Sequence, residues 1–416
     1  MGPTLPLVLV SSALIAGFAS PAICQTDGAD QANVPVRQRA HPEHEPSGIV
    51  RDGIYYYPSV AAGVMVDSNV FASNDAPADD LALLITPALL IRSDGATGLH
   101  ELQLSAKHYQ FDRFDSEDRT EARARLTSSR PISSDVKFDS AFEAARRFEQ
   151  RGDSLTATDS RRPIAYHDLR ADVGLTKTFN RLGITVAGGV RSLTFEDGET
   201  LAGAHLDQSY RDGTIVTASV KPFYEISPGY RAFLRFESNW RDYEGAGTLD
   251  RDSQGFVARG GLEFQLTPII FGSIEAGYLE QDYSNPLIPN ATGLSALGRL
   301  TWLMTPLMTV SLFGSRTVAE IAAQNQEARI DISAGGRIDY EPLRDLIVST
   351  EVSFTEEEFT GTSRQDDVVK VQTQIDYFMN SYIQLGVHYI FDDRQSDIAD
   401  LSFERHRVTV NVTAHY

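Results

Sequence analysis

The chain has 416 residues and a formal net charge of −20, from 57 acidic and 37 basic side chains. A surface that binds nucleic acid must be basic to displace counterions, so this balance excludes DNA and RNA as expected partners. Only 42% of residues are hydrophobic and no internal run of 18 apolar residues occurs, which excludes helical membrane spans. The single cysteine excludes a disulfide framework and a cysteine-based metal site.

The first 24 residues have the pattern of a secretory signal peptide. Leu5–Phe18 is apolar and is followed by small residues and a proline in Ala19–Ala22, although no Lys or Arg lies near Met1. Cleavage after Ala22 and cleavage after Cys24 both fit the preference for small residues. A lipidated Cys24 is disfavoured because Ile23 is bulky. The segment predicts export.

Residues 25–52 are expected to form a flexible periplasmic N-terminal segment, since Pro, Gln, Asp and His are frequent there and no hydrophobic periodicity appears. His41 and His44 lie in the sequence HPEHEP. Two histidines beside glutamates in a tail are usually solvated, so no metal site is predicted. The structured domain is expected over residues 53–416.

Alternation with a period of two dominates residues 53–416 and predicts β-strands, because successive strand side chains point to opposite faces. In the last such segment, Val408, Val410, Val412, Ala414 and Tyr416 share one face, and Arg407, Thr409, Asn411, Thr413 and His415 share the other. Residues 329–340 and 382–391 repeat the pattern. Each segment therefore has one apolar and one polar face, which a soluble sandwich would also show.

The connections distinguish a membrane barrel from a sandwich. Short turns, such as those at Asn180, Ser227 and Thr305, alternate along the chain with long acidic or Gly/Ser/Asp-rich loops, such as those near Gly198 and Gly245. Short periplasmic turns and long extracellular loops are typical of outer-membrane barrels. The prediction is an all-β fold, a transmembrane antiparallel up-and-down β-barrel.

The strand count is about 18, or 16 if weak early segments merge. The strands are expected to begin near residues 54, 81, 99, 120, 136, 165, 184, 211, 231, 254, 270, 294, 308, 328, 346, 367, 382 and 403. An even number places both ends of the barrel on the periplasmic side. Closure requires the first strand to pair with the last.

Aromatic residues gather near the strand ends and predict two belts at the membrane interfaces. At the loop ends they include Tyr109, Phe111, Trp240, Tyr278, Phe354 and Phe359, and at the turn ends Phe179, Phe223, Tyr224, Trp302, Tyr340 and Tyr416.

No catalytic, cofactor-binding or metal-binding residue is predicted, and the chain is not expected to be an enzyme. The barrel histidines are His100, His108, His167, His205, His388, His406 and His415, and none has a Ser or an acid nearby in sequence in a catalytic spacing. No phosphate loop, HExxH or GxSxG motif occurs.

Several segments resemble the family of bacterial outer-membrane proteins known as putative beta-barrel porin 2. The resemblance lies in Pro58–Phe71, Tyr224–Glu244, Asp250–Thr267 and Gly277–Leu312 and in the closing strand, and it is most specific in the turn Ser227–Tyr230 and in Ser68–Phe71. It implies a barrel in the outer membrane of a Gram-negative bacterium that acts in exopolysaccharide or capsular polysaccharide export. It carries over no functional residues.

Two other functions stay open from the sequence, a small-solute porin and a non-conducting structural barrel that partners a periplasmic export protein. The expected partners are outer-membrane lipid, lipopolysaccharide, the barrel-assembly machinery during biogenesis and, through the resemblance, periplasmic polysaccharide-export proteins. No cofactor is expected.

Overall fold

The structure is a computed structural model, and it describes residues 34–95, 97–153, 160–245, 250–319, 329–359 and 363–416. The predicted signal peptide, residues 1–24, and the first part of the predicted flexible segment, residues 25–33, lie outside these ranges. Within the described ranges, no helix is long and apolar enough to cross a membrane.

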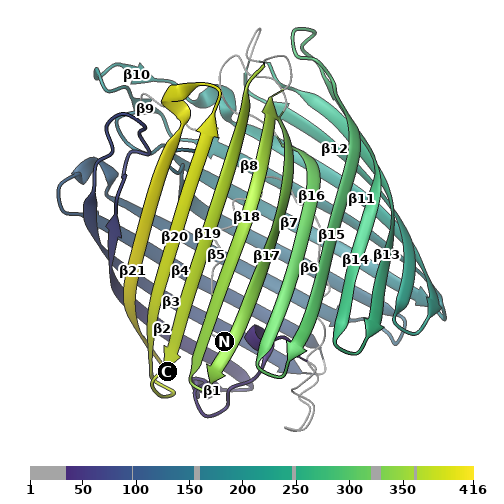
Figure 1. The fold of residues 1–416 in the computed structure, drawn as a ribbon. Helices are drawn as coiled ribbons and strands as arrows, with labels where there is room; N and C mark the ends of the chain where they lie inside the picture. The colour runs from purple at the N-terminus through teal and green to yellow at the C-terminus, as the bar shows by residue number, and fades with distance from the viewer. Residues whose placement is uncertain (1–33, 96, 154–159, 246–249, 320–328, 360–362) are drawn as a thin grey trace.

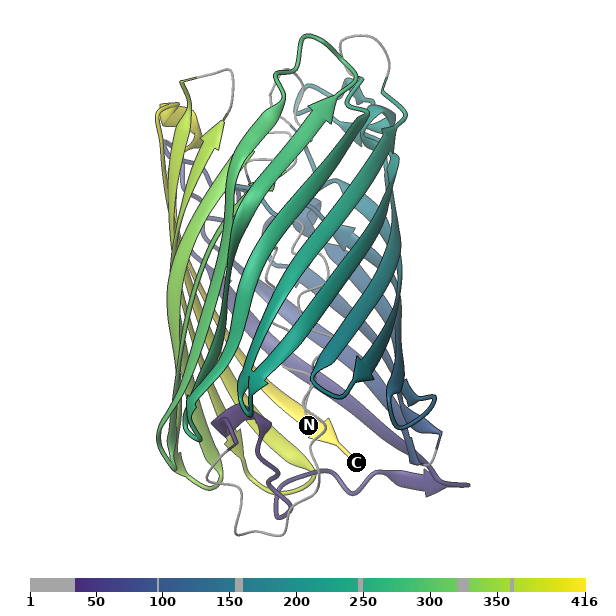
Figure 2. The same cartoon turned by 90° about the vertical axis from the view of Figure 1, so that its right-hand side faces the viewer.

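The chain forms a closed antiparallel barrel of 18 strands (Figures 1 and 2). The barrel strands are β2 (Ile54–Asp67), β3 (Asp80–Gly95), β4 (Gly98–Phe111), β5 (Arg119–Pro131), β6 (Val136–Phe148), β7 (Ala165–Phe179), β8 (Leu182–Phe195), β11 (Gly213–Ser227), β12 (Tyr230–Tyr243), β13 (Ser253–Thr267), β14 (Ile270–Tyr283), β15 (Ala291–Thr305), β16 (Met308–Ala319), β17 (Arg329–Leu343), β18 (Leu346–Phe359), β19 (Gln365–Phe378), β20 (Ile383–Ser396) and β21 (Phe403–His415).

The remaining elements are short. Strand β1 (Ile49–Arg51) pairs with the start of β2, and β9 (Gly198–Glu199) pairs with β10 (His205–Leu206). Four 3₁₀ turns complete the described elements, η2 (Val36–Gln38), η3 (Asp115–Glu117), η4 (Ser209–Arg211) and η6 (Ala399–Leu401).

The first and last barrel strands close the cylinder. Strand β2 pairs with β21 over nine residues, from Ser59 opposite His415 to Asp67 opposite Arg407. Closure removes both sheet edges, so the backbone N–H and C=O groups of the strands pair within the ring. The predicted closure and the upper strand count are confirmed.

Side-chain exposure follows the predicted alternation. Val408, Val410 and Val412 on β21 are 39%, 54% and 48% exposed on the outer face. On β17, Arg329 and Asp331 are buried on the inner face, whereas Ile338 is 46% exposed on the outer face. The wall is therefore apolar outside and polar inside, as the period of two predicts.

Short and long connections separate to opposite ends of the barrel. Strand β2 begins, and strand β21 ends, at the side of the barrel that carries the short turns (Figure 1). The long loops at the other end hold η3, η4, η6 and the β9–β10 pair. This arrangement matches the expected periplasmic and extracellular ends of an outer-membrane barrel.

The aromatic belts are only partly as predicted. Trp240, Tyr278, Phe354, Phe179, Tyr224, Trp302, Tyr340 and Tyr416 are exposed on the outer face. Tyr109, Phe111, Phe223 and Phe359 are instead buried. These four have the strand parity of inward-facing residues, so their position near a strand end did not decide their face.

Candidate functional site in the barrel lumen

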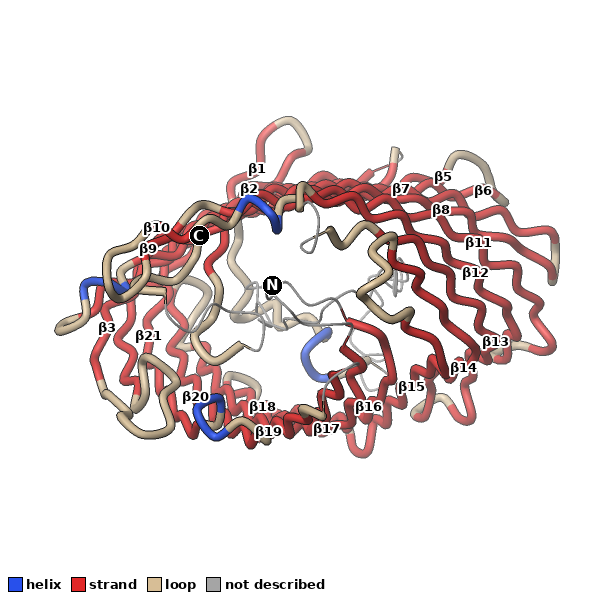
Figure 3. The backbone as a smooth tube through the Cα atoms, turned by 90° about the horizontal axis from the view of Figure 1, so that it is seen from above, coloured by secondary structure: helices blue, strands red, loops and turns tan. Residues whose placement is uncertain are grey.

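A cavity of about 520 Å³ lies in the lumen, between the middle of the barrel and the long-loop end. Its walls are formed by inward-facing side chains of β7, β8, β11 and β12 on one side and of β16 to β21 on the other. Figure 3 shows the barrel from above as an elongated ring, with loop segments inside it.

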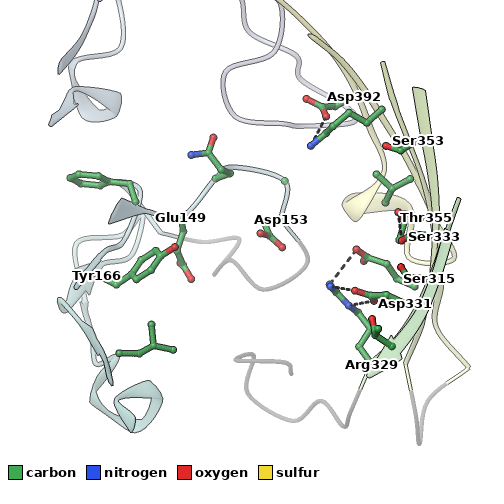
Figure 4. A pocket seen from close by; sticks show the side chains of 18 of the residues that line it. Glu149, Asp153, Tyr166, Ser315, Arg329, Asp331, Ser333, Ser353, Thr355 and Asp392 are labelled. Carbon is green, nitrogen blue, oxygen red and sulfur yellow. Dashed lines mark hydrogen bonds and ion pairs between the residues drawn. The ribbon is translucent and has the colours of Figure 1, made fainter. Parts of the chain in front are cut away.

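The described part of the connection between β6 and β7 folds into the lumen and narrows it. Its described residues are 149–153 and 160–164. The Arg151 guanidinium donates to both oxygens of Glu117, at 2.7 and 3.3 Å, and to the Ser160 carbonyl at 2.7 Å. Asp153 lies on this loop between the two cavity walls (Figure 4). The loop therefore divides the space inside the ring.

Gly152 allows this loop to pack against the opposite wall. Its φ is +83°, a conformation that favours glycine. A Cβ added there would lie 2.5 Å from the Phe403 ring and 2.7 Å from the Ala72 Cβ. At the loop start, burial raises the pKa of the Glu149 carboxyl, and the neighbouring Arg211 guanidinium opposes that shift.

The wall formed by β7, β8 and β12 carries arginines. Arg191 is held by Asp168 through two hydrogen bonds of 2.9 and 3.0 Å. Arg170 and Arg241 line the same wall, and Arg211 and Arg251 line it from the adjoining loops. Because these arginines come from separate strands and loops, the sequence pattern alone did not identify this group.

The opposite wall carries a buried network of alternating charges that crosses four strands. The Arg329 Nε lies 2.6 Å from Asp331 Oδ1 and the Arg329 Nη1 lies 3.2 Å from Glu357 Oε1. Arg394 then joins Glu357 at 3.4 Å to Asp366 at 2.9 Å. Figure 4 shows the Arg329 part of the network facing the cavity. The network ties β17, β18, β19 and β20 together, and its charges largely neutralise one another.

One side of the lumen is apolar. An apolar cluster fills the inner side of β2, β3 and β4 near the long loops, formed by Met65, Val70, Ala82, Leu84, Tyr109 and Phe111, with Phe114 packed against it. The polar inner face expected of every strand predicted a polar lumen all round the barrel. The structure corrects this to a polar cavity beside an apolar packed region, which shifts the cavity away from β2–β4.

The N-terminal segment (residues 34–45) enters the barrel at the short-turn end. Arg37 donates to Asp376 at 2.5 Å and to Ser349 at 2.7 Å. The Val36 N–H donates to the Thr309 hydroxyl at 3.0 Å, and the Val36 side chain is fully buried. Arg39 adds a contact with the Glu341 carboxylate at 3.4 Å.

These contacts differ from the flexible lead-in expected for residues 25–52. Its described part is held against the inner wall because two of its arginines meet carboxylates of β17 and β19. Those partners lie about 300 residues away in the chain, so the composition of the segment could not indicate them. The rings of His41 and His44 stack near Phe378, at 6.0 and 6.3 Å.

Among the described residues, no group of three or more His, Cys, Asp and Glu is placed to hold a metal ion. One relay of side chains lies on the outer face near the long loops. The Tyr389 hydroxyl lies 2.9 Å from His406 Nδ1, and His406 Nε2 lies 3.1 Å from Glu404. It joins residues of β20 and β21, and sequence spacing did not reveal it.

The fold is similar to that of several solved structures. They include OccK2 (OpdF) of Pseudomonas aeruginosa in complex with glucuronate, at 11% identity and a TM-score of 0.46, covering 88% of this chain and 99% of that one. The siderophore receptor PiuA of Acinetobacter baumannii has 9% identity and a TM-score of 0.47, with 88% and 82% covered. The siderophore receptor PirA of P. aeruginosa has 7% identity and a TM-score of 0.42, with 89% and 81% covered.

No curated protein matches the sequence. The model of the family described as "Putative beta-barrel porin 2" matches residues 41–416, which includes every strand of the barrel. With the closed ring, the apolar outer face and the polar cavity, this match gives a porin-like outer-membrane barrel fold. The chain belongs to the putative beta-barrel porin 2 family.

Proposed function

We propose that the protein resides in the bacterial outer membrane and provides a passive passage for small polar solutes. The observation that carries the proposal is the polar cavity of about 520 Å³ inside a closed barrel whose outer face is apolar. The apolar outer face of such a barrel packs against lipid, and its polar interior accommodates water. A passive passage requires no catalytic residue.

The cavity favours small solutes over a polymer. The β6–β7 loop narrows the lumen near the long-loop end, and the N-terminal segment occupies part of the short-turn end. A polysaccharide chain needs a continuous channel past both the β6–β7 loop and the N-terminal segment. Export of exopolysaccharide or capsule, which the family resemblance implied, is therefore the second candidate, and it requires the N-terminal segment to leave the lumen.

Liposome swelling tests the proposed passage. Purified protein in liposomes should admit neutral sugars at rates that fall with their size, from monosaccharides to tetrasaccharides. Liposomes without protein are the control. No swelling with any monosaccharide would contradict the passage and favour a non-conducting structural barrel that partners a periplasmic export protein. A deletion strain that loses surface polysaccharide but keeps its solute uptake would favour export.

A further inference from the structure

Three arginines of the cavity wall lie at one level of the sheet. Arg170 on β7 is the register partner of Arg191 on β8. Arg191 is in turn opposite Ile215 on β11, which is opposite Arg241 on β12. All four side chains line the cavity. We name Arg170, Arg191 and Arg241 the arginine row.

Like charges directly opposite each other on neighbouring strands destabilise a sheet. The repulsion between Arg170 and Arg191 is relieved only in part. Arg191 is bound by Asp168, as described above, whereas Arg170 forms no ion pair or hydrogen bond among the described residues. Two acids lie two residues away on the same strand face: Asp168, which is bound to Arg191, and Asp172, which attracts Arg170 electrostatically without a hydrogen bond to it. The Arg170 guanidinium therefore faces the cavity with its hydrogen-bond donors available.

The cavity lining has more basic than acidic side chains, although the chain as a whole is strongly acidic. Its lining includes eleven Lys and Arg residues and seven Asp and Glu residues, whereas the whole chain has a net charge of −20. Four further acids are buried behind the lining arginines and do not themselves line the cavity, namely Asp67, Glu117, Asp168 and Asp366. When these four acids are counted, basic and acidic residues are equal in number, so the excess of guanidinium groups is confined to the wall that carries the arginine row.

We propose that the arginine row is a binding subsite for the carboxylate or phosphate group of a small anionic solute. The inference rests on the proposed passage and names its substrate class. A guanidinium presents paired N–H donors that match the oxygens of either group. The stacked rings of Tyr166 and Phe195, 5.2 Å apart, line the same wall and offer an apolar surface to the carbon skeleton.

Current block in planar bilayers tests the subsite. The probes are galacturonate, galactose 1-phosphate and galactose, which share a sugar ring and differ in the anionic group. Both anionic probes, or one of them, should reduce the chloride current of the wild type at concentrations where galactose has no effect. The double variant Arg170→Gln/Arg241→Gln should weaken that block by about tenfold or more, since it removes two positive charges and the charge-assisted hydrogen bonds they can donate to the anionic group.

The control variant is Arg130→Gln, which makes the same kind of charge change at an exposed position of β5 that does not line the cavity. The anionic probes should reduce its chloride current as they do that of the wild type. Arg170→Gln alone should not lower the unfolding temperature, because it removes a cross-strand repulsion. Equal block by all three probes, or unchanged block in the double variant, would overturn the subsite alone. Absence of any current would overturn the passage itself.

Discussion

Val410 lies within β21 on the outer face of the barrel, and Thr409 beside it faces inward. An arginine on the lipid face near the membrane midplane costs roughly 2–4 kcal/mol, whereas a polar lumen accepts one. Val410→Arg should therefore lower the thermal stability and Thr409→Arg should leave it nearly unchanged. Heat-modifiable gel mobility after stepwise heating measures both variants. Equal losses would contradict the assigned facing.

The seam between the first and last strands is held by a buried ion pair. The Arg405 Nε lies 2.9 Å from Asp67 Oδ1, and the Asp67 side chain is fully buried. Because removal of one partner leaves a buried charge uncompensated, Asp67→Asn should cost about 3 kcal/mol.

The same change at Asp52 is the control for this seam variant. Asp52 pairs with Arg51 at 3.8 Å, and both side chains are more than 80% exposed, at 90% and 83%. Exposed pairs contribute little. Asp52→Asn should leave the unfolding temperature of the purified protein unchanged. If the two variants unfolded at the same temperature, the Arg405–Asp67 pair would not stabilise the seam.

At the scale of the elements, the N-terminal segment allows a direct test of its position. Val36→Cys and Thr309→Cys place thiols on two residues already in contact, and the only natural cysteine, Cys24, lies in the predicted signal peptide. Mild oxidation should form a reducible cross-link, seen as a mobility shift on unfolded samples.

Thr373 provides the matched control for the cross-link. Its register with Thr350 and Ile338 places it on the outer face of the barrel. Val36→Cys combined with Thr373→Cys should stay reduced, because the wall separates the two thiols. Equal cross-linking of both pairs would mean that the segment is not held at the Thr309 position.

The strands were predictable from the sequence because each has one face toward the outside of the barrel and one face toward the lumen. The expected start at residue 54 agrees with β2, and the expected starts at 136, 270, 308, 346 and 403 agree with β6, β14, β16, β18 and β21. Alternation carries this information within each strand, so no distant partner is needed. The even count and the closure then follow from the alternation of short and long connections.

The contents of the lumen were not predictable in the same way. The arginine row depends on the register between β7, β8, β11 and β12, and a shift by one residue would turn each side chain to the other face. The contact of Arg37 with Asp376 joins the two ends of the chain. Neither leaves a local pattern, because one strand or tail supplies only one partner.

At the scale of the whole molecule, the ring has a lipid-compatible outside and a cavity with charged walls. Three elements occupy separate parts of the interior. They are the apolar cluster of β2–β4, the β6–β7 loop and the N-terminal segment. What they leave is the cavity beside the arginine-bearing wall. The size of the cavity is therefore set by these inward elements and not by the strand number alone.

Single-channel recording in planar bilayers tests this central claim most directly. The purified protein should give discrete, ohmic current steps in potassium chloride, and a variant lacking residues 34–45 should give larger steps because the short-turn end is widened. Absence of steps from both proteins, with the barrel shown to be folded by heat-modifiable mobility, would contradict a water-filled passage.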